Sequence, residues 1–351
     1  MVFNKAAALL RVAMTPEDIF GDKDQIAGKY RELAKATHPD SNKGSNLANE
    51  IFQLLQAWHA KAMAKVAART YGDRRAHVRT SITHRTARYT IMSRVASGDL
   101  AEVYGGVGPG KHAVLIKVGR IPVNNDLLAN EAKTLRYMCV DAPVKDLAVM
   151  QHIPKFVDAF QLADGKLRKQ VNVIEWVKGG YTLEDVMRVY PDGIDPRDMA
   201  WMFNRVLGGL LAAHQAQRIH GAVVPSHVLI FPETHNGMLI DWSYSVEPNH
   251  ALRAIAPRWR AFYPPEVLIK NPATTGTDIY MAAKCALALL GKMPAAAPRA
   301  IVGFMRACTL GPAHRPRDVY ELFVEFQDIL KALYGKPAFR KFTMLEKKGG
   351  G

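Results

Sequence analysis

Apolar positions recur at helical spacing through the N-terminal part of the chain. In 22–37, Ile26, Tyr30, Leu33 and Thr37 fall on one helical face, and a short apolar piece ending near "EDIFG" precedes them. After the polar stretch "SNKGS", one longer apolar stripe consists of Leu47, Ile51, Leu54, Trp58, Ala62 and Val66. The pattern predicts three helical pieces, the last two of which form an antiparallel hairpin.

From residue 88 onward the pattern changes to the alternation that is typical of strands. Strands are predicted over "RYTIMSRV", "AEVYGGV", "HAVLIKVGR" and "VNVIEWV", with a helix containing "NEAKTLRYM" before the last of them. Further helices are predicted over 181–190 and 196–217. Strands first and helices afterwards predict a small β-rich lobe followed by a larger helical lobe. The expected fold class is therefore α+β, with an all-α N-terminal hairpin preceding a bilobal domain.

Length and composition agree with two domains in a reducing compartment. The chain has 351 residues and a 48% apolar fraction, which can supply a core for one small and one large domain. Its three cysteines, Cys139, Cys285 and Cys308, show no metal-ligand spacing, so neither a disulfide framework nor a zinc site is expected. The start of the chain interrupts its apolar stretch with proline and acidic residues, and no apolar run is long enough to span a bilayer. We expect a cytoplasmic protein with no membrane partner.

The net charge of +15 favours acidic partners but does not choose among them. Positive charge is densest in 69–88, which contains one acidic residue, Asp73, and six arginines: Arg69, Arg74, Arg75, Arg79, Arg85 and Arg88. Aromatic residues for base stacking are nearly absent there, which favours a solvated basic linker over a nucleic-acid site. A nucleic-acid partner is therefore not expected, and salt-dependent DNA binding would be needed to support one.

The loop of the predicted hairpin contains His38, Pro39 and Asp40 at the end of a basic amphipathic helix. The stretch "KYRELAKATHPDSNKG", with Ile51, Leu54, Ala57 and Trp58 in the helix after it, resembles the J-domain of DnaJ-type co-chaperones. The resemblance covers 1–70, although the connection after "IFG" is shorter than the family usually has. It implies docking on a DnaK-type chaperone and stimulation of its ATP hydrolysis.

In this resemblance the chaperone-binding residues are Lys29, Arg31, Lys35, His38, Pro39 and Asp40. Basic side chains on the helix offer charge for a long-range encounter, and the loop supplies hydrogen bonds at a turn that Pro39 stiffens. A purely structural alternative is that His38 caps the helix C-terminus and Asp40 caps the turn.

The region 88–335 resembles the protein-kinase superfamily through several features in the family's order. "VASGDLAEVY" (95–104) stands at the glycine-rich loop and keeps only Gly98 of three glycines. "VLIK" supplies Lys117 for the α- and β-phosphates, and Glu131 follows it as the partner on the next helix. "VIEWVKGG" resembles the hinge, with Ile174 as gatekeeper and the backbone of Glu175 and Val177 facing the adenine.

The stretch "RIHGAVVPSHVLI" resembles a degenerate kinase catalytic loop. Aligned on His220, Gly221 replaces the family's arginine and Ala222 replaces the aspartate that positions the substrate hydroxyl. His227 replaces the asparagine that holds a second magnesium ion, whereas "LIDWS" keeps the metal-binding aspartate as Asp241. No catalytic residue can therefore be assigned in this loop, and the resemblance implies a pseudokinase that binds ATP and Mg²⁺.

Other matches in this region support the fold rather than the chemistry. In the family's pattern Glu266 of "FYPPEV" pairs with Arg315, and Asp278 braces the backbone of the catalytic loop. Three more positions stand where the family stacks a hydrophobic spine: Leu135, His220 and Trp242.

The expected organisation is a J-domain (1–70), a basic linker (71–87), a kinase-like domain (88–335) and a basic tail (336–351). The expected function is a co-chaperone adaptor that recruits and stimulates a DnaK-type chaperone, with a pseudokinase domain that binds nucleotide or an unidentified client protein. The alternative is an active atypical protein kinase or nucleotidyl transferase that uses Lys117, Asp241 and His227.

Overall fold

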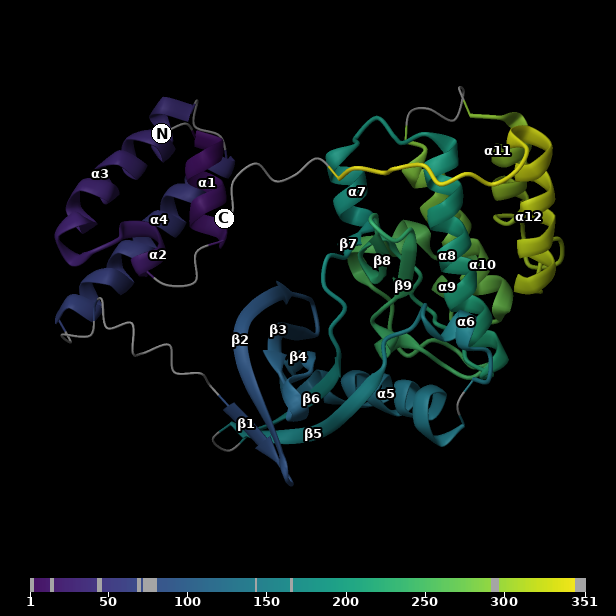
Figure 1. The fold of residues 1–351 in the computed structure, drawn as a ribbon, viewed down its shortest axis with the longest axis horizontal. Helices are drawn as coiled ribbons and strands as arrows, with labels where there is room; N and C mark the ends of the chain where they lie inside the picture. The colour runs from purple at the N-terminus through teal and green to yellow at the C-terminus, as the bar shows by residue number, and fades with distance from the viewer. Residues whose placement is uncertain are drawn as a thin grey trace. The chain divides into compact units, whose positions relative to one another are not determined.

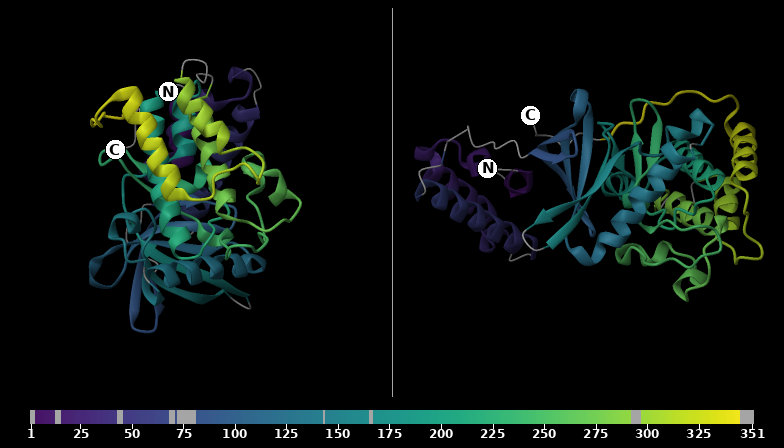
Figure 2. Two further views of the ribbon diagram at one scale, coloured as in Figure 1. Left: turned by 90° about the vertical axis from the view of Figure 1, so that its right-hand side faces the viewer. Right: turned by 90° about the horizontal axis from the view of Figure 1, so that it is seen from below.

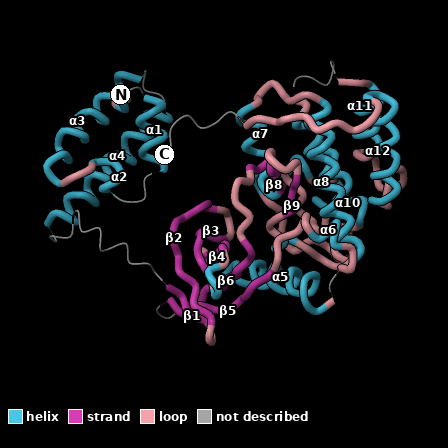
Figure 3. Tube along the Cα trace, viewed as in Figure 1, coloured by secondary structure: helices cyan, strands magenta, loops and turns pink. Residues whose placement is uncertain are grey.

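The computed structural model describes residues 3–12, 16–42, 46–67, 71, 81–142, 144–164, 167–291 and 297–344. The chain divides into two compact units, one within 1–80 and one within 81–346, and each is described by itself (Figure 1). Figure 3 shows helices alone in the first unit, and strands and helices in the second. Within the described ranges, no helix combines the length and the apolar character that crossing a membrane requires.

Among its described residues, the N-terminal unit contains four α-helices: α1 (Phe3–Val12), α2 (Pro16–Phe20), α3 (Ile26–Thr37) and α4 (Asn46–Ala67). The short piece expected before the hairpin is thus two helices, α1 and α2. Rings pair Tyr30 with His59 and His38 with Phe52, at centroid distances of 4.2 and 5.2 Å. The earlier residue of the α3 segment thus meets the later residue of α4, and the later one meets the earlier. Helices α3 and α4 therefore run antiparallel, as the apolar pattern predicts.

The core of this unit is apolar and draws on all four helices. Leu10, Phe20, Leu33 and Ile51 are buried in one cluster. The predicted stripe on α4 is displaced slightly, because Leu47 at its start is 43% exposed. Side-chain bonds fasten the helices together, since the Trp58 indole donates to the Leu10 carbonyl at 3.1 Å.

The second unit begins with an antiparallel sheet of order β1-β2-β3-β4-β6-β5. Its first strand lies inside the segment 71–87 that was expected as a linker, while Arg74, Arg75 and Arg79 of that segment lie outside the described residues. Helix α5 (Asn125–Arg136) packs beside this sheet, against β5 and β6 (Figure 2). The strands are β1 (Ser81–His84), β2 (Ala87–Ser97), β3 (Ala101–Val107), β4 (Ala113–Gly119), β5 (Phe156–Asp164) and β6 (Leu167–Glu175).

The larger part of this unit is mainly helical and contains the main apolar core. A small antiparallel sheet of order β7-β8-β9 lies beside its long central helix, α8 (Pro196–Gln215). A small β-rich lobe followed by a larger helical lobe is therefore confirmed. The other elements are α6 (Leu147–Met150), β7 (Tyr181–Thr182), α7 (Leu183–Val189), β8 (Val228–Phe231), β9 (Asn236–Leu239), α9 (Pro265–Leu268), α10 (Thr275–Leu289), α11 (Arg299–Ala307) and α12 (Val319–Tyr334).

The segment 337–344 after α12 packs against the larger lobe. Phe342 and Met344 are buried in the main core, and the Phe339 ring stacks on His235 at 4.2 Å. Arg340 forms ion pairs with Asp195 and Asp198 at 3.3 and 3.1 Å. The basic tail expected over 336–351 therefore includes a part that packs on the larger lobe, with Phe342 and Met344 in the core.

Candidate functional site

Strand β4 and helix α5 bring Lys117 and Glu131 together. The alternation of β4 buries Val114 and Ile116 on one face and turns Lys117 toward α5. The Lys117 Nζ lies 2.6 Å from Glu131 Oε1, and the two side chains are only 11% and 1% exposed. The expected pair is therefore formed, in a place where water screens it little.

Asn172 on β6 fixes the other carboxylate oxygen of this pair. Its side-chain amide donates to Glu131 Oε2 at 2.9 Å and to the Leu128 carbonyl at 2.8 Å. With one oxygen held by an ammonium and the other by an amide, Glu131 has a single orientation. Sequence reasoning missed Asn172, although a polar residue inside the apolar run "VNVIEWV" was a signal that could have identified it.

Asp241 reaches the same place from the segment after β9. Its Oδ1 lies 3.4 Å from Lys117 Nζ, and its backbone is left-handed, with φ 63° and ψ 65°. A non-glycine residue in this conformation is strained, and such strain is found preferentially at functional sites. The segment is tied to α5 because the Asn130 amide donates to the Ser243 and Ser245 carbonyls at 3.1 and 2.8 Å. Asn130 is a second residue that sequence reasoning missed.

The electrostatics of the cluster favour its charged forms. Burial alone would lower the pKa of Lys117, but Asp241 and Glu131 together raise that pKa above its ordinary value. Burial alone would likewise raise the pKa of Asp241, yet Lys117 and then His227 hold that pKa well below its ordinary range. Lys117 is therefore an ammonium and Asp241 a carboxylate across the physiological pH range.

His227 lies next to Asp241 in a restricted orientation. Its Nδ1 is 3.0 Å from the Ala222 carbonyl, which can only accept, so Nδ1 carries its hydrogen. Its Nε2 is 3.3 Å from Asp241 Oδ2 and donates to it when the ring is an imidazolium. An imidazole nitrogen is also a poor ligand for Mg²⁺, which prefers oxygen.

The donor set fits one magnesium ion held jointly with phosphate. Among the described residues, no group of three His, Cys, Asp or Glu side chains is placed to hold a metal ion. Mg²⁺ is, however, commonly bound through one or two carboxylates and the phosphates of a nucleotide, with water completing the shell. Asp241 can supply that carboxylate, whereas His227 fits the role of its hydrogen-bond partner better than that of a second ligand.

The loop before β8 is braced from α10, as the kinase pattern predicts. Asp278 accepts from the backbone N–H groups of His220 and Gly221 at 2.8 and 2.9 Å. Burial lowers the pKa of His220 to about 4. The neutral ring therefore donates through Nε2 to the Ile240 carbonyl at 3.1 Å and packs edge-on against Trp242.

Two catalytic functions are missing from this loop for steric as well as chemical reasons. Gly221 has φ 72°, and a Cβ there would lie 2.7 Å from Leu252 and 2.9 Å from the Tyr244 carbonyl. An arginine would not fit without a rearrangement. Ala222 is fully buried and offers no group that could take a proton.

The positions expected around a nucleotide lie on the edge of the small lobe. Gly98 is at the turn between β2 and β3, where its N–H donates to the Ala101 carbonyl at 2.9 Å. At the end of β6, the Glu175 amide donates to the Lys155 carbonyl at 3.0 Å, and the Trp176 amide that follows donates to the Ala113 carbonyl at 3.1 Å. Within the part of the chain that is described, the next amide, that of Val177, has no backbone acceptor. It is thus a donor that an adenine ring could use.

The scaffold contacts expected from the kinase pattern are formed. Arg315 Nη1 lies 2.7 Å from Glu266 Oε1, and both side chains are largely buried. Leu135, His220 and Trp242 are fully buried, as a hydrophobic spine requires. The gatekeeper position, Ile174, is 6% exposed at the end of β6.

In the N-terminal unit, His38, Pro39 and Asp40 lie on the loop that follows α3. Asn42 closes this loop, because its side-chain amide donates to the Ala36 and His38 carbonyls at 3.1 and 2.8 Å. The side chains of His38 and Asp40 are 46% and 90% exposed, and they lie 3.6 Å apart. The tripeptide thus presents one imidazole and one carboxylate to solvent from a closed turn.

The basic residues of α3 do not all share one face. Arg31 and Lys35 are exposed and four residues apart, so they lie on the same side of the helix, away from the buried Leu33. Lys29 is turned toward Glu32 and pairs with it at 3.0 Å. Arg31 and Lys35 therefore form the basic surface, and Lys29 lies on another side of the helix.

Comparisons with known proteins define the class of fold and no more. No protein-family model matches the chain, and no curated protein matches its sequence. By structure, the chain is similar to the solved BubR1 kinase domain, with a TM-score of 0.53 over 73% of this chain and 84% of that one. The sequence identity is 15%, so the match shows a kinase-like fold without assigning an activity. The likeness agrees with the bilobal architecture that carries Lys117, Glu131 and Asp241.

Proposed function

We propose that this protein is a J-domain co-chaperone whose kinase-like unit binds ATP with magnesium but does not transfer phosphate efficiently to a hydroxyl group. The observation that carries the proposal is the buried cluster in which Lys117, Glu131 and Asp241 persist beside an alanine at position 222. Phosphate binding requires the first three groups, whereas activation of a hydroxyl requires a base at the fourth position.

Each residue of the cluster has a separate task in the proposed complex. The Lys117 ammonium binds the α- and β-phosphates, and Glu131 holds that ammonium in place. A bound magnesium ion would neutralise phosphate charge, with Asp241 as its protein ligand. The Val177 amide orients the adenine, and the exposed turn at Gly98 lies where the family's loop covers the phosphates. None of these tasks is that of a base for a substrate hydroxyl group.

The first test is ATP binding to the purified full chain, by calorimetry and thermal unfolding, with and without magnesium. Saturation at a hundredfold excess over Kd should stabilise the folded protein by about 2.7 kcal/mol, which raises its melting temperature by several degrees. Asp241→Asn should abolish the part that depends on magnesium. The control is Asp328→Asn, a change of the same kind on the exposed side of α12. Absence of any shift at millimolar ATP would refute the nucleotide-binding part.

The second test concerns the N-terminal unit and is independent of the first. The full-length protein should accelerate ATP hydrolysis by a DnaK-type chaperone. His38→Gln should reduce this stimulation at least tenfold, because the exposed imidazole contributes a directional hydrogen bond. Gln53→Ala, an exposed change on α4, serves as the control. Unchanged stimulation by the His38 variant would contradict the J-domain assignment.

A second candidate function is atypical phosphoryl or nucleotidyl transfer, and the placement of His227 favours it. The Nε2 of His227, 3.3 Å from Asp241, is the one side-chain base beside the cluster in the described loop. Transfer of labelled phosphate or nucleotide from ATP to a protein, lost in both His227→Ala and Asp241→Asn, would establish this activity. If no label is transferred after prolonged incubation, this second candidate is rejected, and ATP binding without transfer is retained as the proposed function.

A further inference from the structure

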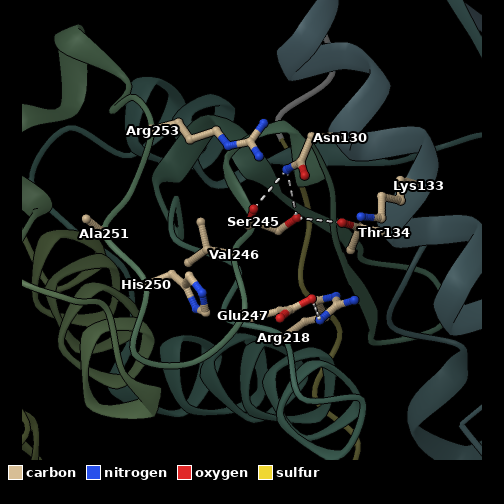
Figure 4. Close-up of a pocket in the computed structure, with 10 residues that line it drawn as sticks. All are labelled: Asn130, Lys133, Thr134, Arg218, Ser245, Val246, Glu247, His250, Ala251 and Arg253. Atoms are coloured by element: carbon tan, nitrogen blue, oxygen red, sulfur yellow. Dashed lines mark hydrogen bonds and ion pairs between the residues drawn. The ribbon is translucent and has the colours of Figure 1, made fainter.

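A polar pocket lies between α5 and the segment 245–253, apart from the cluster around Lys117 (Figure 4). Its volume is about 260 Å³. Helix α5 contributes Asn130, Lys133 and Thr134 to its wall, and Arg218 comes from the segment after α8. The segment itself contributes Ser245, Val246, Glu247, His250, Ala251 and Arg253.

The floor of the pocket is rigid and already hydrogen-bonded. Ser245 is 3% exposed, and its hydroxyl donates to the Trp242 carbonyl at 2.8 Å. Thr134 Oγ1 lies 2.8 Å from the Ser245 hydroxyl oxygen. The Asn130 amide is also occupied by backbone carbonyls of this segment. Recognition of a ligand must therefore come from the charged side chains at the rim.

The rim carries more positive than negative charge. Lys133, Arg218 and Arg253 contribute three cations, and Glu247 is the one carboxylate among the lining residues. Glu247 pairs with Arg218 at 3.1 Å, while Lys133 and Arg253 are exposed and form no ion pair within the described residues. Figure 4 shows these side chains around the opening, with Arg218 and Glu247 together at one side of it. Two uncompensated cations match the charge of a phosphate monoester.

The pocket continues into a wider groove, which has room for the residues on either side of a phosphorylated side chain in a bound peptide. This groove measures about 520 Å³ and shares Arg218, Glu247 and His250 with the pocket. Tyr137, Gln217, Pro248 and Asn249 line the rest of it. The Arg218 guanidinium is stacked 4.6 Å from the Tyr137 ring centre, which holds it at the junction.

We infer that this surface is a binding site for a phosphorylated side chain in a peptide segment, with the phosphate between Lys133 and Arg253 and the flanking residues in the adjoining groove. Arginine and lysine clusters recognise phosphate by charge-assisted hydrogen bonds. The site would take a phosphoprotein partner and is independent of nucleotide binding.

The experiment is calorimetric titration of the full chain at about 150 mM salt, where exposed charges beyond roughly 8 Å are screened. The probes are a short capped peptide of alanine and glycine with one central phosphoserine, its unphosphorylated form, and inorganic phosphate. The phosphopeptide should bind, and its unphosphorylated form should not. Inorganic phosphate should bind more weakly than the phosphopeptide; equal affinity would overturn the peptide part of the inference.

Three variants test the assignment to this pocket. Replacement of both Lys133 and Arg253 by alanine should weaken phosphopeptide binding about a hundredfold, since each removes a charged hydrogen-bond donor. Both side chains are exposed, so the melting temperature should stay unchanged. Arg260→Ala, an exposed arginine outside the pocket, is the matched control and should leave the affinity unaltered.

The third variant, Glu247→Gln, should tighten phosphopeptide binding severalfold, because it frees Arg218 and removes the one carboxylate at the rim. If the phosphopeptide were attracted only by the overall positive charge of the protein, its affinity would fall equally in the Arg260 variant and in the Lys133/Arg253 double variant. That result, or full binding by the double variant, would overturn the proposed site.

Discussion

At the scale of single residues, the candidate nucleotide site depends on charges that are buried together. Lys117 lies between two carboxylates, and Asn172 and Asn130 hold the elements that bring those carboxylates close. Removing Lys117 would leave Glu131 and Asp241 as unpaired charges in a largely buried place, which costs about 3–5 kcal/mol. A test of ligand binding is therefore cleaner at Asp241, whose neutral replacement keeps its shape.

His220 gives a residue-scale prediction about pH. Its folded-state pKa of about 4 lies below the ordinary value of about 6.5, so the unfolded chain takes up the proton first as pH falls. The free energy of unfolding should then decrease between pH 6.5 and 4, by about 1.4 kcal/mol per pH unit from this residue, and should be unaffected above that window.

The measurement is denaturant unfolding of the protein and of His220→Phe at several pH values. The phenylalanine keeps a ring against Trp242 but loses the bond to the Ile240 carbonyl, so the variant should be less stable at pH 7. Its stability should fall less steeply toward pH 5. Equal slopes would show that His220 is not the buried neutral group described above.

At the scale of elements, predictability from sequence followed the strength of the local signal. Helices α8 and α4 and strands β2 to β4 were predicted because their apolar positions repeat with one period over many residues. Strands β1 and β5 were missed, since both lie at the edges of the sheet and bury only part of their side chains. The segment 337–344 has no helical or strand periodicity, and only its contacts with α8 and with His235, which lies just before β9, explain why it packs there.

This C-terminal segment gives an element-scale prediction. Phe342 is 6% exposed in the main core, so Phe342→Ala should lower the free energy of unfolding by about 3–5 kcal/mol. Phe339 is 68% exposed and only stacks on His235, so Phe339→Ala should cost about 1 kcal/mol or less. Thermal unfolding of the two variants checks this, and similar losses would mean that the segment does not pack as described.

At the scale of the whole molecule, the chain is organised as two units with separate apolar cores. One cluster draws only on 3–71, and the two others draw only on 82–344. Such units generally fold by themselves. The proposed functions divide the same way, with the loop of His38, Pro39 and Asp40 (the HPD loop) in one unit and the Lys117 cluster in the other.

The corresponding prediction is that 81–346 produced alone keeps the unfolding transition that it has in the full chain. In calorimetry, the melting temperature of this transition should differ by no more than about 2 °C between the fragment and the intact protein, since little apolar surface would be lost from the core of the second unit. A fragment that unfolds without cooperativity would show that the N-terminal unit is needed for the fold of the second.

The sequence by itself determined the periodicities of the helical hairpin and of the main strands, the position of the HPD loop, and the identity of Lys117, Glu131 and Asp241. These follow from local spacing and from motifs in a fixed order. Only the tertiary structure decided that Asn172 and Asn130 complete the cluster, that an arginine cannot stand at Gly221, and that Lys133 and Arg253 border one pocket. Those facts join residues far apart in the chain, and their reason is the close packing of separate elements, which one-dimensional patterns do not contain.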